Sequence, residues 1–356
     1  MQVEEIETPA LLVDLEAMES NLLCMAKFFA NRKCKVRPHF KNHKVPAFAR
    51  NQLDSGAVGI TCATLREAEI LSDHGITDIL IANEIVGRDK LEKLAGLLRR
   101  ASVVVAVDNE KVLGEMALVQ RQLDAKFEIV VDVNIGLNRC GVPPGGPAVA
   151  LARSAVSAGI IVRGIMGYDG HFQAQPPSRE RDGSVLEGSG TLLDSAALIA
   201  EAGIPVSIVS TGGTGTYSIS GSCEGITDIQ AGSYLLMDTR YKNLGAPFQR
   251  SLTVLSTVIS MRDSQHAVID CGLKEMSGER GLPELKDLPS ARLTALHAEH
   301  ALIEIDPHSS SQIGREPTVG KKIEVWVQYS DATVNLHSRM YGVRNGQVEE
   351  VFRIEH

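Results

Sequence analysis

The sequence predicts a β/α barrel followed by an antiparallel β domain, and three observations support this prediction. Short β-branched runs alternate with helical stretches from about residue 10 to 240, eight such runs can be counted, and the pattern changes after about residue 250. Alternation of this kind is typical of βαβ units that form a parallel sheet. Eight strands is the number that closes a β/α barrel.

The predicted barrel strands follow one another along the first two thirds of the chain. In order they are residues 10–14, 34–39, 57–63, 78–83, 102–108, 127–134, 160–167 and 205–210. Helix-like segments separate them, for example LREAEILSDHG (65–75) and EKVLGEMALVQRQL (110–123). The stretch 173–187 is polar and contains proline, so we expect a surface excursion or mobile loop there rather than a domain linker.

Strand-like runs separated by turn residues dominate the last hundred residues. They are LTVLSTVISM (252–261), HAVIDCG (266–272), KKIEVWVQY (321–329) and GQVEEVFRIE (346–355). This texture predicts a separate antiparallel domain. We therefore expect a barrel over residues 21–248, a β domain over 249–356, and an N-terminal segment 1–20 that contributes to the β domain.

The composition is that of a soluble, cytoplasmic protein. Hydrophobic residues make up 44% and charged residues 22%, and no run approaches the ~18 apolar residues needed to cross a bilayer. The acidic N-terminus lacks the features of an export signal. Six cysteines occur singly, which fits reduced thiols, and the net charge of -8 disfavours a nucleic-acid partner.

The segment VRPHFKNHKVP (36–46) carries the most chemical information. Two histidines and two lysines follow the end of a predicted strand, and in β/α barrels the carboxyl ends of strands hold the active site. A partly desolvated lysine there loses its proton more easily and becomes an amine nucleophile. From position alone, a solvated basic loop remains the alternative for Lys41 and Lys44.

Two further segments also follow predicted strands. STGGTGTYS (210–218) combines three glycines with hydroxyl residues, a pattern that either cradles an anion with backbone N–H groups or forms a plain turn. Arg139 in GLNRCGV, with Tyr168 and His171 in GYDGHF, could surround a ring-shaped ligand. Each of these three side chains could also be structural.

With these residues in view, the sequence resembles fold-type III pyridoxal-phosphate enzymes of the D-threonine aldolase and D-serine dehydratase group, and more distantly alanine racemase. The resemblance runs nearly from end to end. Its motifs are TPALLVDL, RPHFKNHK, GITCATLREAE, VDVNIGLNRCGV, GYDGH, STGGTGTY, DIQAGSYLLMD, GLKEMSGERGLP and AEH. It implies an alanine racemase-like barrel with pyridoxal 5'-phosphate at its mouth.

The resemblance also implies roles for individual residues. Lys41, the first lysine of its motif, would join the cofactor's aldehyde, and Lys44 would lie outside. Gln230 stands where racemases carry an arginine against the pyridine nitrogen, which favours the aldolase and dehydratase branch. The other implied cofactor contacts are Arg139 at the phenolic oxygen, Tyr168 and His171 along the ring, Thr211, Gly212, Gly213, Thr214, Gly215 and Thr216 at the phosphate, and a hydroxyl contact from Tyr241.

One departure from the group concerns a divalent metal. Its members resemble one another in a site where a histidine precedes a Cys or Asp by two residues, but here Tyr329 replaces the histidine and Asp331 remains as the candidate ligand. A phenol binds such metals poorly near neutral pH. Either the enzyme works without metal and Tyr329 does acid or base work, or Glu299, His300 or His337 rebuilds a shifted site.

The predicted function is that of a lyase acting on a small D-configured 3-hydroxy amino acid, by retro-aldol cleavage rather than dehydration. Lys41, Tyr329 and His171 are the predicted catalytic residues. An amino-acid racemase or epimerase is the alternative enzyme, and a non-catalytic carrier of the cofactor is the alternative from another class. The resemblance further implies a homodimer without nucleic-acid or membrane partners.

Overall fold

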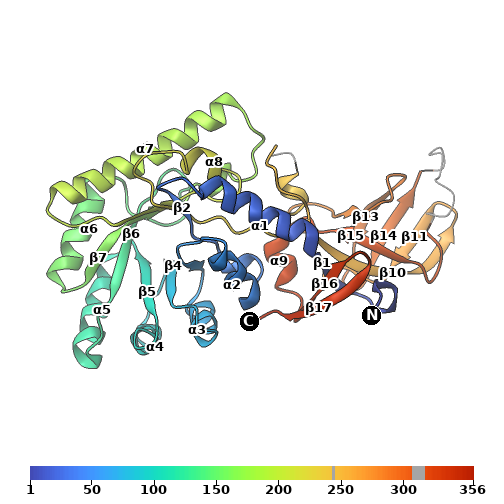
Figure 1. Ribbon diagram of the computed structural model, residues 1–356, viewed down its shortest axis with the longest axis horizontal. Coiled ribbons are helices and arrows are strands. Elements are labelled where there is room, and N and C mark those ends of the chain that lie inside the picture. Colours follow the sequence, from blue (N-terminus) through green and yellow to red (C-terminus); the bar gives the residue numbers. More distant parts are fainter. Residues whose placement is uncertain (243–244, 307–316) are drawn as a thin grey trace. The chain divides into compact units, whose positions relative to one another are not determined.

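The computed structural model describes residues 1–242, 245–306 and 317–356. The chain forms two compact units, each with its own sheet (Figure 1). The β unit consists of Met1–Leu22, Asn42–Val45 and Ser233–His356, and the barrel unit consists of Leu23–Lys41 and Pro46–Gly232. The predicted fold class, a β/α barrel with a C-terminal β domain, is confirmed.

The barrel unit holds an eight-stranded parallel sheet in the order β2-β9-β8-β7-β6-β5-β4-β3. A parallel bridge between His39 and Thr61 joins the two ends of this order. The sheet therefore closes on itself. Its strands are β2 (Lys35–Val36), β3 (Ile60–Cys62), β4 (Asp78–Glu84), β5 (Ser102–Val107), β6 (Glu128–Asp132), β7 (Ile161–Gly167), β8 (Ile208–Thr211) and β9 (Asp228–Ile229).

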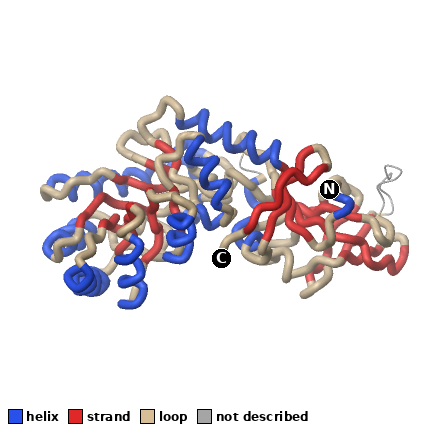
Figure 2. Tube along the Cα trace, turned by 60° about the horizontal axis from the view of Figure 1, so that its bottom comes forward, coloured by secondary structure: helices blue, strands red, loops and turns tan. Residues whose placement is uncertain are grey.

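Helices of the barrel unit lie around its strands (Figure 2). Polar caps start several of them: Thr64 accepts a hydrogen bond from the Glu67 N–H, and Ser178 accepts one from the Arg181 N–H. Apolar side chains from five strands, β4 to β8, form a buried cluster. The helices are α1 (Leu15–Phe29), which begins in the β unit, α2 (Pro46–Asp54), α3 (Leu65–Asp73), α4 (Arg88–Leu97), α5 (Glu110–Leu123), α6 (Gly146–Ser157), α7 (Arg179–Glu201) and α8 (Tyr217–Ser220).

Two predictions about the barrel were wrong. Residues 10–14 form β1 (Ala10–Asp14) in the other sheet, and the two-residue strand β9 takes its place. A buried β1 has the same apolar pattern in either sheet, and β9 is too short to show a period. The predicted loop 173–187 is largely helical, because α7 begins at Arg179 with a polar first turn and buries Val185.

The β unit contains a nine-stranded sheet within its described residues. Its pairs are antiparallel except for β1 with β16. Besides β1, the strands are β10 (Leu252–Asp263), β11 (His266–Ile269), β12 (Glu284–Leu285), β13 (Ala291–Leu296), β14 (Ala301–Ile305), β15 (Lys322–Trp326), β16 (Arg339–Arg344) and β17 (Gln347–Arg353). The sequence predicted β10, β11, β15 and β17.

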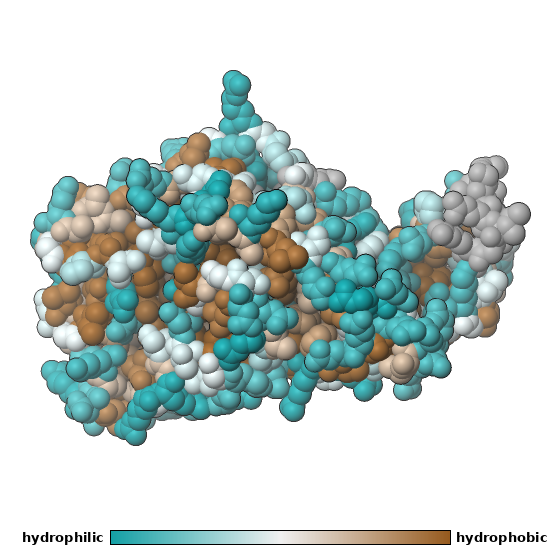
Figure 3. All heavy atoms as spheres, viewed as in Figure 1, coloured by the Kyte–Doolittle hydropathy of each residue, from teal (hydrophilic) through white to brown (hydrophobic). Residues whose placement is uncertain are grey.

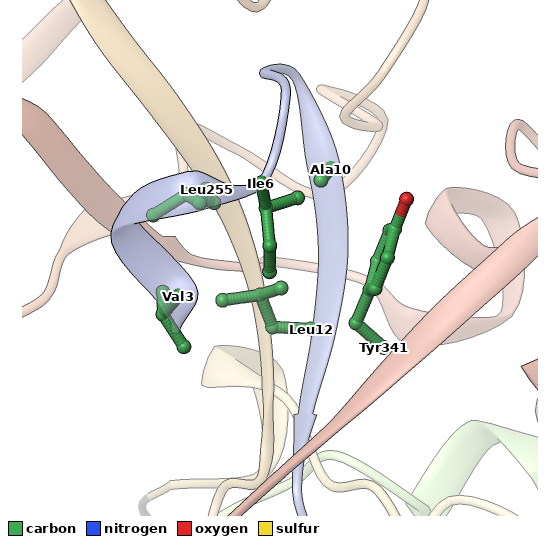
Figure 4. Close-up of a cluster of buried hydrophobic side chains, with 6 residues drawn as sticks. All are labelled: Val3, Ile6, Ala10, Leu12, Leu255 and Tyr341. Carbon is green, nitrogen blue, oxygen red and sulfur yellow. The ribbon is translucent and has the colours of Figure 1, made fainter. Parts of the chain in front are cut away.

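One hydrophobic core of the β unit joins segments from both ends of the chain (Figure 4). Ile6, Leu12, Leu255 and Tyr341 are among its buried side chains. These residues come from the N-terminal segment, β1, β10 and β16. The packing of β1 between β10 and β16 therefore fixes the N-terminal segment within this unit.

The surface shown in Figure 3 mixes hydrophilic with hydrophobic residues. Among residues 1–242, 245–306 and 317–356, no helix combines the length and hydrophobicity needed to span a membrane. The single turns of 3-10 helix are η1 (Val3–Glu5), η2 (Phe40–Asn42), η3 (Gly170–Phe172) and η4 (Thr239–Tyr241), and the β unit also has the short helix α9 (Ser330–Val334).

Candidate active site

Lys41 lies in η2, just past the carboxyl end of β2. Its side chain is half-buried, between Phe40 and Asn42, which are both almost fully buried. This is the end of the barrel at which β/α barrels carry their chemistry. Lys44, the rival lysine, belongs to the β unit, and its ammonium donates a hydrogen bond to Asn335 Oδ1 at 2.6 Å.

The glycine-rich loop after β8 is held in place by Gln173, a buried residue of the turn after β7. Gln173 Nε2 donates to Asp169 Oδ1 at 2.5 Å and to Thr216 Oγ1 at 2.9 Å, and Gln173 Oε1 accepts from the Gly215 N–H at 2.8 Å. Arg181, also buried, donates to the Gly215 carbonyl. The loop conformation therefore depends on the segment that follows β7.

The same loop has no room for larger residues. A Cβ at Gly215 would lie 1.9 Å from the Gln173 carbonyl oxygen, and a Cβ at Gly213 would lie 2.6 Å from Gln173 Oε1. Gly212 adopts φ +70, a conformation that favours glycine. The N–H groups of Gly213 and Gly215 already donate to Thr216 Oγ1 and Gln173, so an anion bound here must use other groups of the loop or displace these bonds.

The remaining predicted phosphate residues are also buried in the barrel unit. Thr211, the last residue of β8, donates its hydroxyl to the Gly167 carbonyl at 2.7 Å. Thr214 and Thr216 are buried. The hydroxyl of Thr211 therefore ties the end of β8 to the end of β7 and supports the start of the loop.

Two buried polar atoms near this loop lack partners. Among the residues that the structure describes, neither His171 Nδ1 nor Asp169 Oδ2 has a hydrogen-bond partner. Burial raises the pKa of Asp169, and the hydrogen bonds with Thr216 and Gln173 oppose this shift because they lower the pKa. Because buried polar groups are almost always satisfied, such atoms indicate a place for a ligand or water.

His171 also lies close to the strand end next to it. A Cβ at Gly136 would lie 3.3 Å from His171 Nε2. Gly136 belongs to the loop after β6 that carries Arg139, whose guanidinium carbon lies 5.6 Å from the ring centroid of Tyr168. The structure therefore brings His171 near the Arg139 loop and places Arg139 against Tyr168, as expected for residues at successive strand ends.

Three neighbouring strands end in carboxyl groups that the sequence analysis did not single out. Glu84 ends β4, Asp108 follows β5 and Asp132 ends β6. The pKa of Asp132 is raised to about 8, and burial is the largest cause. The charge and hydrogen bond of Glu84 and the charge of Asp108 also raise this pKa, whereas the charge of Arg139 lowers it. At neutral pH the Asp132 carboxyl therefore keeps its proton.

Gln230 is buried and tied to a chain of polar groups across β8 and β9. Its Nε2 donates to Ser210 Oγ at 3.0 Å, and that hydroxyl donates to Asp228. Asp228 in turn lies 3.7 Å from Arg37 Nε. The side chain of Gln230 is therefore held in one orientation.

The predicted residues of the β unit gather at the start of α9. Tyr329 is the residue before the helix, and Asp331 Oδ1 accepts a hydrogen bond from Asn42 Nδ2 at 2.5 Å. Burial, and the charge of Asp331 after it, raises the pKa of Tyr329. Asp238 accepts from the Ser330 N–H and hydroxyl at 2.9 Å each.

Tyr241 lies in η4, close in sequence to Asp238. It is almost fully buried, and burial raises the pKa of its phenol well above the usual range. Its hydroxyl is hydrogen-bonded to Ser233 of the same unit. The phenol therefore stays protonated and is available as a hydrogen-bond donor or acceptor, not as a base.

Comparison with known proteins identifies the family of this chain. The alanine racemase N-terminal domain matches residues 13–240, and the putative serine dehydratase domain matches residues 251–343. A D-threonine aldolase from Arthrobacter sp is 34% identical over 354 residues, which cover 98% of this chain and 92% of that protein. The chain belongs to the D-threonine aldolase and D-serine dehydratase group. It is a pyridoxal-phosphate-dependent lyase with an alanine racemase-like fold.

Other members of this group match over the whole chain as well. The 3-hydroxy-D-aspartate aldolase of Paracoccus denitrificans (strain Pd 1222) is 28% identical over 99% of this chain and 93% of that protein. The crystal structure of D-threonine aldolase from Filomicrobium marinum superposes with a TM-score of 0.94 at 34% identity, covering 99% of this chain and 95% of that one. Both the barrel and the β unit are therefore shared with the group.

Two of the three side chains considered as replacement metal ligands in this lyase have other partners. Glu299 forms an ion pair with Lys274, and His337 Nε2 donates to the Glu275 carbonyl at 2.8 Å. His300 is exposed. Within the described ranges, no group of three or more His, Cys, Asp and Glu side chains has the arrangement of a metal site.

The sequence analysis did not identify several residues of the candidate site of this lyase. Gln173 and Arg181 lie in the stretch that was expected to be a surface loop. The acidic residues at the ends of β4, β5 and β6 could have been predicted from the sequence. The apolar runs LIANE (80–84), VVVAVD (103–108) and IVVD (129–132) each end in an acidic residue. Successive parallel strands that end in carboxyl groups place those groups at one barrel end.

The raised pKa of Asp132 has a consequence for stability. The folded chain keeps a proton that the unfolded chain releases at the ordinary carboxyl pKa, so the free energy of unfolding falls as pH rises towards 8. Asp132→Asn removes this dependence. The quantity compared is the Tm of Asp132→Asn minus the Tm of the unmodified protein. We expect this difference to increase by about 2–4 °C from about pH 5 to pH 8.

Thermal unfolding of apoenzyme across this pH range measures the effect. Asp194→Asn, which changes an exposed carboxyl on α7, serves as the control and should shift Tm equally at every pH. A Tm difference for Asp132→Asn that is independent of pH would contradict the assignment.

Proposed function

We propose that this lyase cleaves a small D-configured 3-hydroxy amino acid to glycine and an aldehyde. The observation that carries the proposal is the placement of Lys41 at the carboxyl end of β2, in a chain that is 34% identical to a D-threonine aldolase over 98% of its length. Dehydration of the same class of substrate is the second candidate, because the group also contains dehydratases.

The residues of the barrel mouth fit pyridoxal 5'-phosphate. Lys41 supplies an amine for the aldehyde, and Arg139 supplies a fixed cation beside the Tyr168 ring. The buried, unsatisfied His171 Nδ1 is available to a polar group. Gln230 would face the pyridine nitrogen and Tyr241 would add a hydroxyl contact. The phosphate would lie against the loop of Thr211, Gly212, Gly213, Thr214, Gly215 and Thr216.

The protein decides which substrate bond reacts. Bound pyridoxal phosphate supplies an electron sink for negative charge at the substrate Cα. Alignment of the Cα–Cβ bond perpendicular to the ring leads to cleavage, and alignment of Cα–H leads to dehydration or racemisation. His171 is the proposed base for the β-hydroxyl proton, and Lys41 returns a proton to Cα. Tyr329 of the β unit is the third proposed catalytic residue, with a hydroxyl for acid or base work.

Product analysis with D-threonine tests this proposal. Retro-aldol cleavage gives glycine and acetaldehyde in equal amounts, whereas dehydration gives 2-oxobutanoate and ammonia. Uptake of deuterium at Cα without loss of amino acid would identify a racemase or epimerase instead. Cofactor binding with no conversion of D-threonine, D-serine or D-3-hydroxyaspartate would identify a carrier of the cofactor.

We expect catalysis to be independent of divalent metal, because Tyr329 replaces the imidazole of the metal site in the group. Activity should stay within about two-fold after EDTA treatment and should not rise with added Mn²⁺. The measurement is kcat/KM before and after dialysis against EDTA. Loss of activity that Mn²⁺ restores would show that Asp331 and other ligands still bind a metal.

We further propose a cytoplasmic homodimer without nucleic-acid or membrane partners. The resemblance to the group supports the homodimer, and the net charge of -8 disfavours a nucleic-acid partner. The proposed domain boundaries are 1–20, 21–248 and 249–356. Sedimentation analysis of the purified enzyme tests the dimer, and limited proteolysis tests the boundaries.

A further inference from the structure

The side-chain amide of Gln230 presents its two ends to different surroundings. Its Nε2 donates a hydrogen bond to Ser210 Oγ at 3.0 Å. Within the part of the chain that the structure describes, its Oε1 accepts no hydrogen bond. Gln230 directly follows β9, which pairs with β2, the strand that leads to Lys41. The amide end that remains for a ligand at this end of the barrel is therefore the carbonyl oxygen, which is an acceptor.

The Ser210 hydroxyl determines which end of the amide lies against it. A hydroxyl has one hydrogen, and Ser210 donates it to Asp228 Oδ1. Ser210 Oγ can then only accept, so the group beside it must donate. A reversed amide would place Gln230 Oε1 against Ser210 Oγ, two acceptors with no hydrogen between them, in a buried position where this is costly. The direction of the amide therefore depends on Asp228.

Asp228 is held as an acceptor by its other neighbours, which all belong to the barrel unit. Thr227 Oγ1 donates to Asp228 Oδ2 at 3.0 Å, and Arg37 Nε lies 3.7 Å from Asp228 Oδ1. Burial, the largest cause, and the charge of Asp78 raise the pKa of Asp228, whereas the charge of Arg37 and two hydroxyl hydrogen bonds lower it. Arg37 is itself buried and donates to Asp78 Oδ1 at 2.5 Å. The Arg37 cation therefore favours the carboxylate form of Asp228, which can only accept.

We propose that Asp228 and Ser210 are positioning residues, which turn the Gln230 carbonyl oxygen towards the cofactor's pyridine nitrogen and so keep that nitrogen protonated. This inference rests on the proposed function, in which Gln230 faces the pyridine nitrogen. An unprotonated pyridine nitrogen is an acceptor and repels a carbonyl oxygen, whereas a pyridinium N–H, with its proton taken from solvent, donates to it. A protonated ring also withdraws more negative charge from the substrate Cα.

Nitrogen NMR of the holoenzyme tests the proposal without relying on turnover. The apoenzyme is loaded with pyridoxal phosphate that carries the heavy nitrogen isotope in its ring, and the chemical shift distinguishes pyridinium from pyridine. The ring should be protonated in the unmodified enzyme at neutral pH. In Ser210→Ala the amide can turn over, so the ratio of protonated to unprotonated ring should fall by at least ~10-fold. Asp228→Asn, which can present an N–H to Ser210 and reverse the chain of hydrogen bonds, should act in the same direction.

A rescue variant and a control separate positioning from a general effect on the fold. Adding Gln230→Glu to Ser210→Ala supplies an acceptor at both ends of the side chain and should restore the protonated ring. Ser189→Ala is the matched control, because Ser189 is also buried in the barrel unit and donates to another hydroxyl, Ser220 Oγ at 3.3 Å. It should leave the ring signal unchanged. An unprotonated ring in the unmodified holoenzyme, or the same ratio in Ser210→Ala, would overturn the proposal.

Product analysis on the same samples separates this inference from the proposed reaction. A protonated ring that depends on Ser210, in an enzyme that cleaves no D-3-hydroxy amino acid, would support the positioning role and contradict the proposed cleavage. Cleavage by an enzyme whose bound cofactor is unprotonated would support the reaction and overturn the positioning role. A chain that binds no pyridoxal phosphate would contradict both.

Discussion

Lys41→Ala is expected to remove the visible absorbance band of lysine-bound pyridoxal phosphate and to lower turnover by at least ~10³-fold. In the proposed function, the lysine amine holds the cofactor's aldehyde and moves protons at the substrate Cα, and no water molecule can replace both actions. The measurements are an absorbance spectrum of the purified variant and single-turnover kinetics with D-threonine and D-3-hydroxyaspartate.

Lys44→Ala provides the matched control, since Lys44 lies three residues away and donates to Asn335. It should keep the visible band and activity within a few-fold. Borohydride reduction of the unmodified enzyme followed by peptide mapping should find the cofactor on Lys41. A reduced adduct on Lys44, or a band that survives in Lys41→Ala and disappears in Lys44→Ala, would reverse the assignment of the two lysines.

Gly215→Ala should weaken cofactor binding and destabilise the barrel unit. The new Cβ would lie 1.9 Å from the Gln173 carbonyl oxygen and 2.7 Å from its carbonyl carbon, and backbone atoms cannot rotate away. The loop must shift, which strains the hydrogen bond between the Gly215 N–H and Gln173 Oε1. We expect a loss of about 1–3 kcal/mol in the free energy of unfolding and at least ~10-fold weaker binding of pyridoxal phosphate.

Thermal unfolding of the apoenzyme and titration with pyridoxal phosphate measure these two effects separately. Gly190→Ala is the control, because Gly190 lies within α7 and a Cβ there meets no atom within 4 Å. That variant should bind the cofactor normally and have an equal or higher Tm, as alanine favours the helix. Normal cofactor affinity in Gly215→Ala would show that the loop does not hold the phosphate.

Local patterns were sufficient to predict most of the barrel strands. Seven of the eight predicted runs, from 34–39 to 205–210, contain strands of the parallel sheet, because continuous β-branched segments favour buried strands. The run 10–14 has the same pattern but pairs with β10 and β16. Hydrophobicity predicts that such a strand is buried, and it carries no information about which sheet receives it.

Some residues of the candidate site could be predicted from the sequence and others could not. Lys41, Arg139, Tyr168, His171 and the loop after β8 could be named because each belongs to a short motif directly after a strand. The properties of Asp228 and Asp132 depend on what surrounds these side chains: the Ser210 hydroxyl and the Arg37 cation in one case, and burial beside Glu84 in the other.

The sequence by itself determined the fold class, the membership of the D-threonine aldolase and D-serine dehydratase group, and the lysine motif. Only the tertiary structure decided that Gln173 supports the loop at Gly215, and that Ser210 links Gln230 to Asp228. The physical reason is the range of the interactions. Burial and turn formation depend on neighbouring residues and are visible as a periodic pattern in the sequence. Contacts between distant segments depend on strand order and register, which no local pattern specifies.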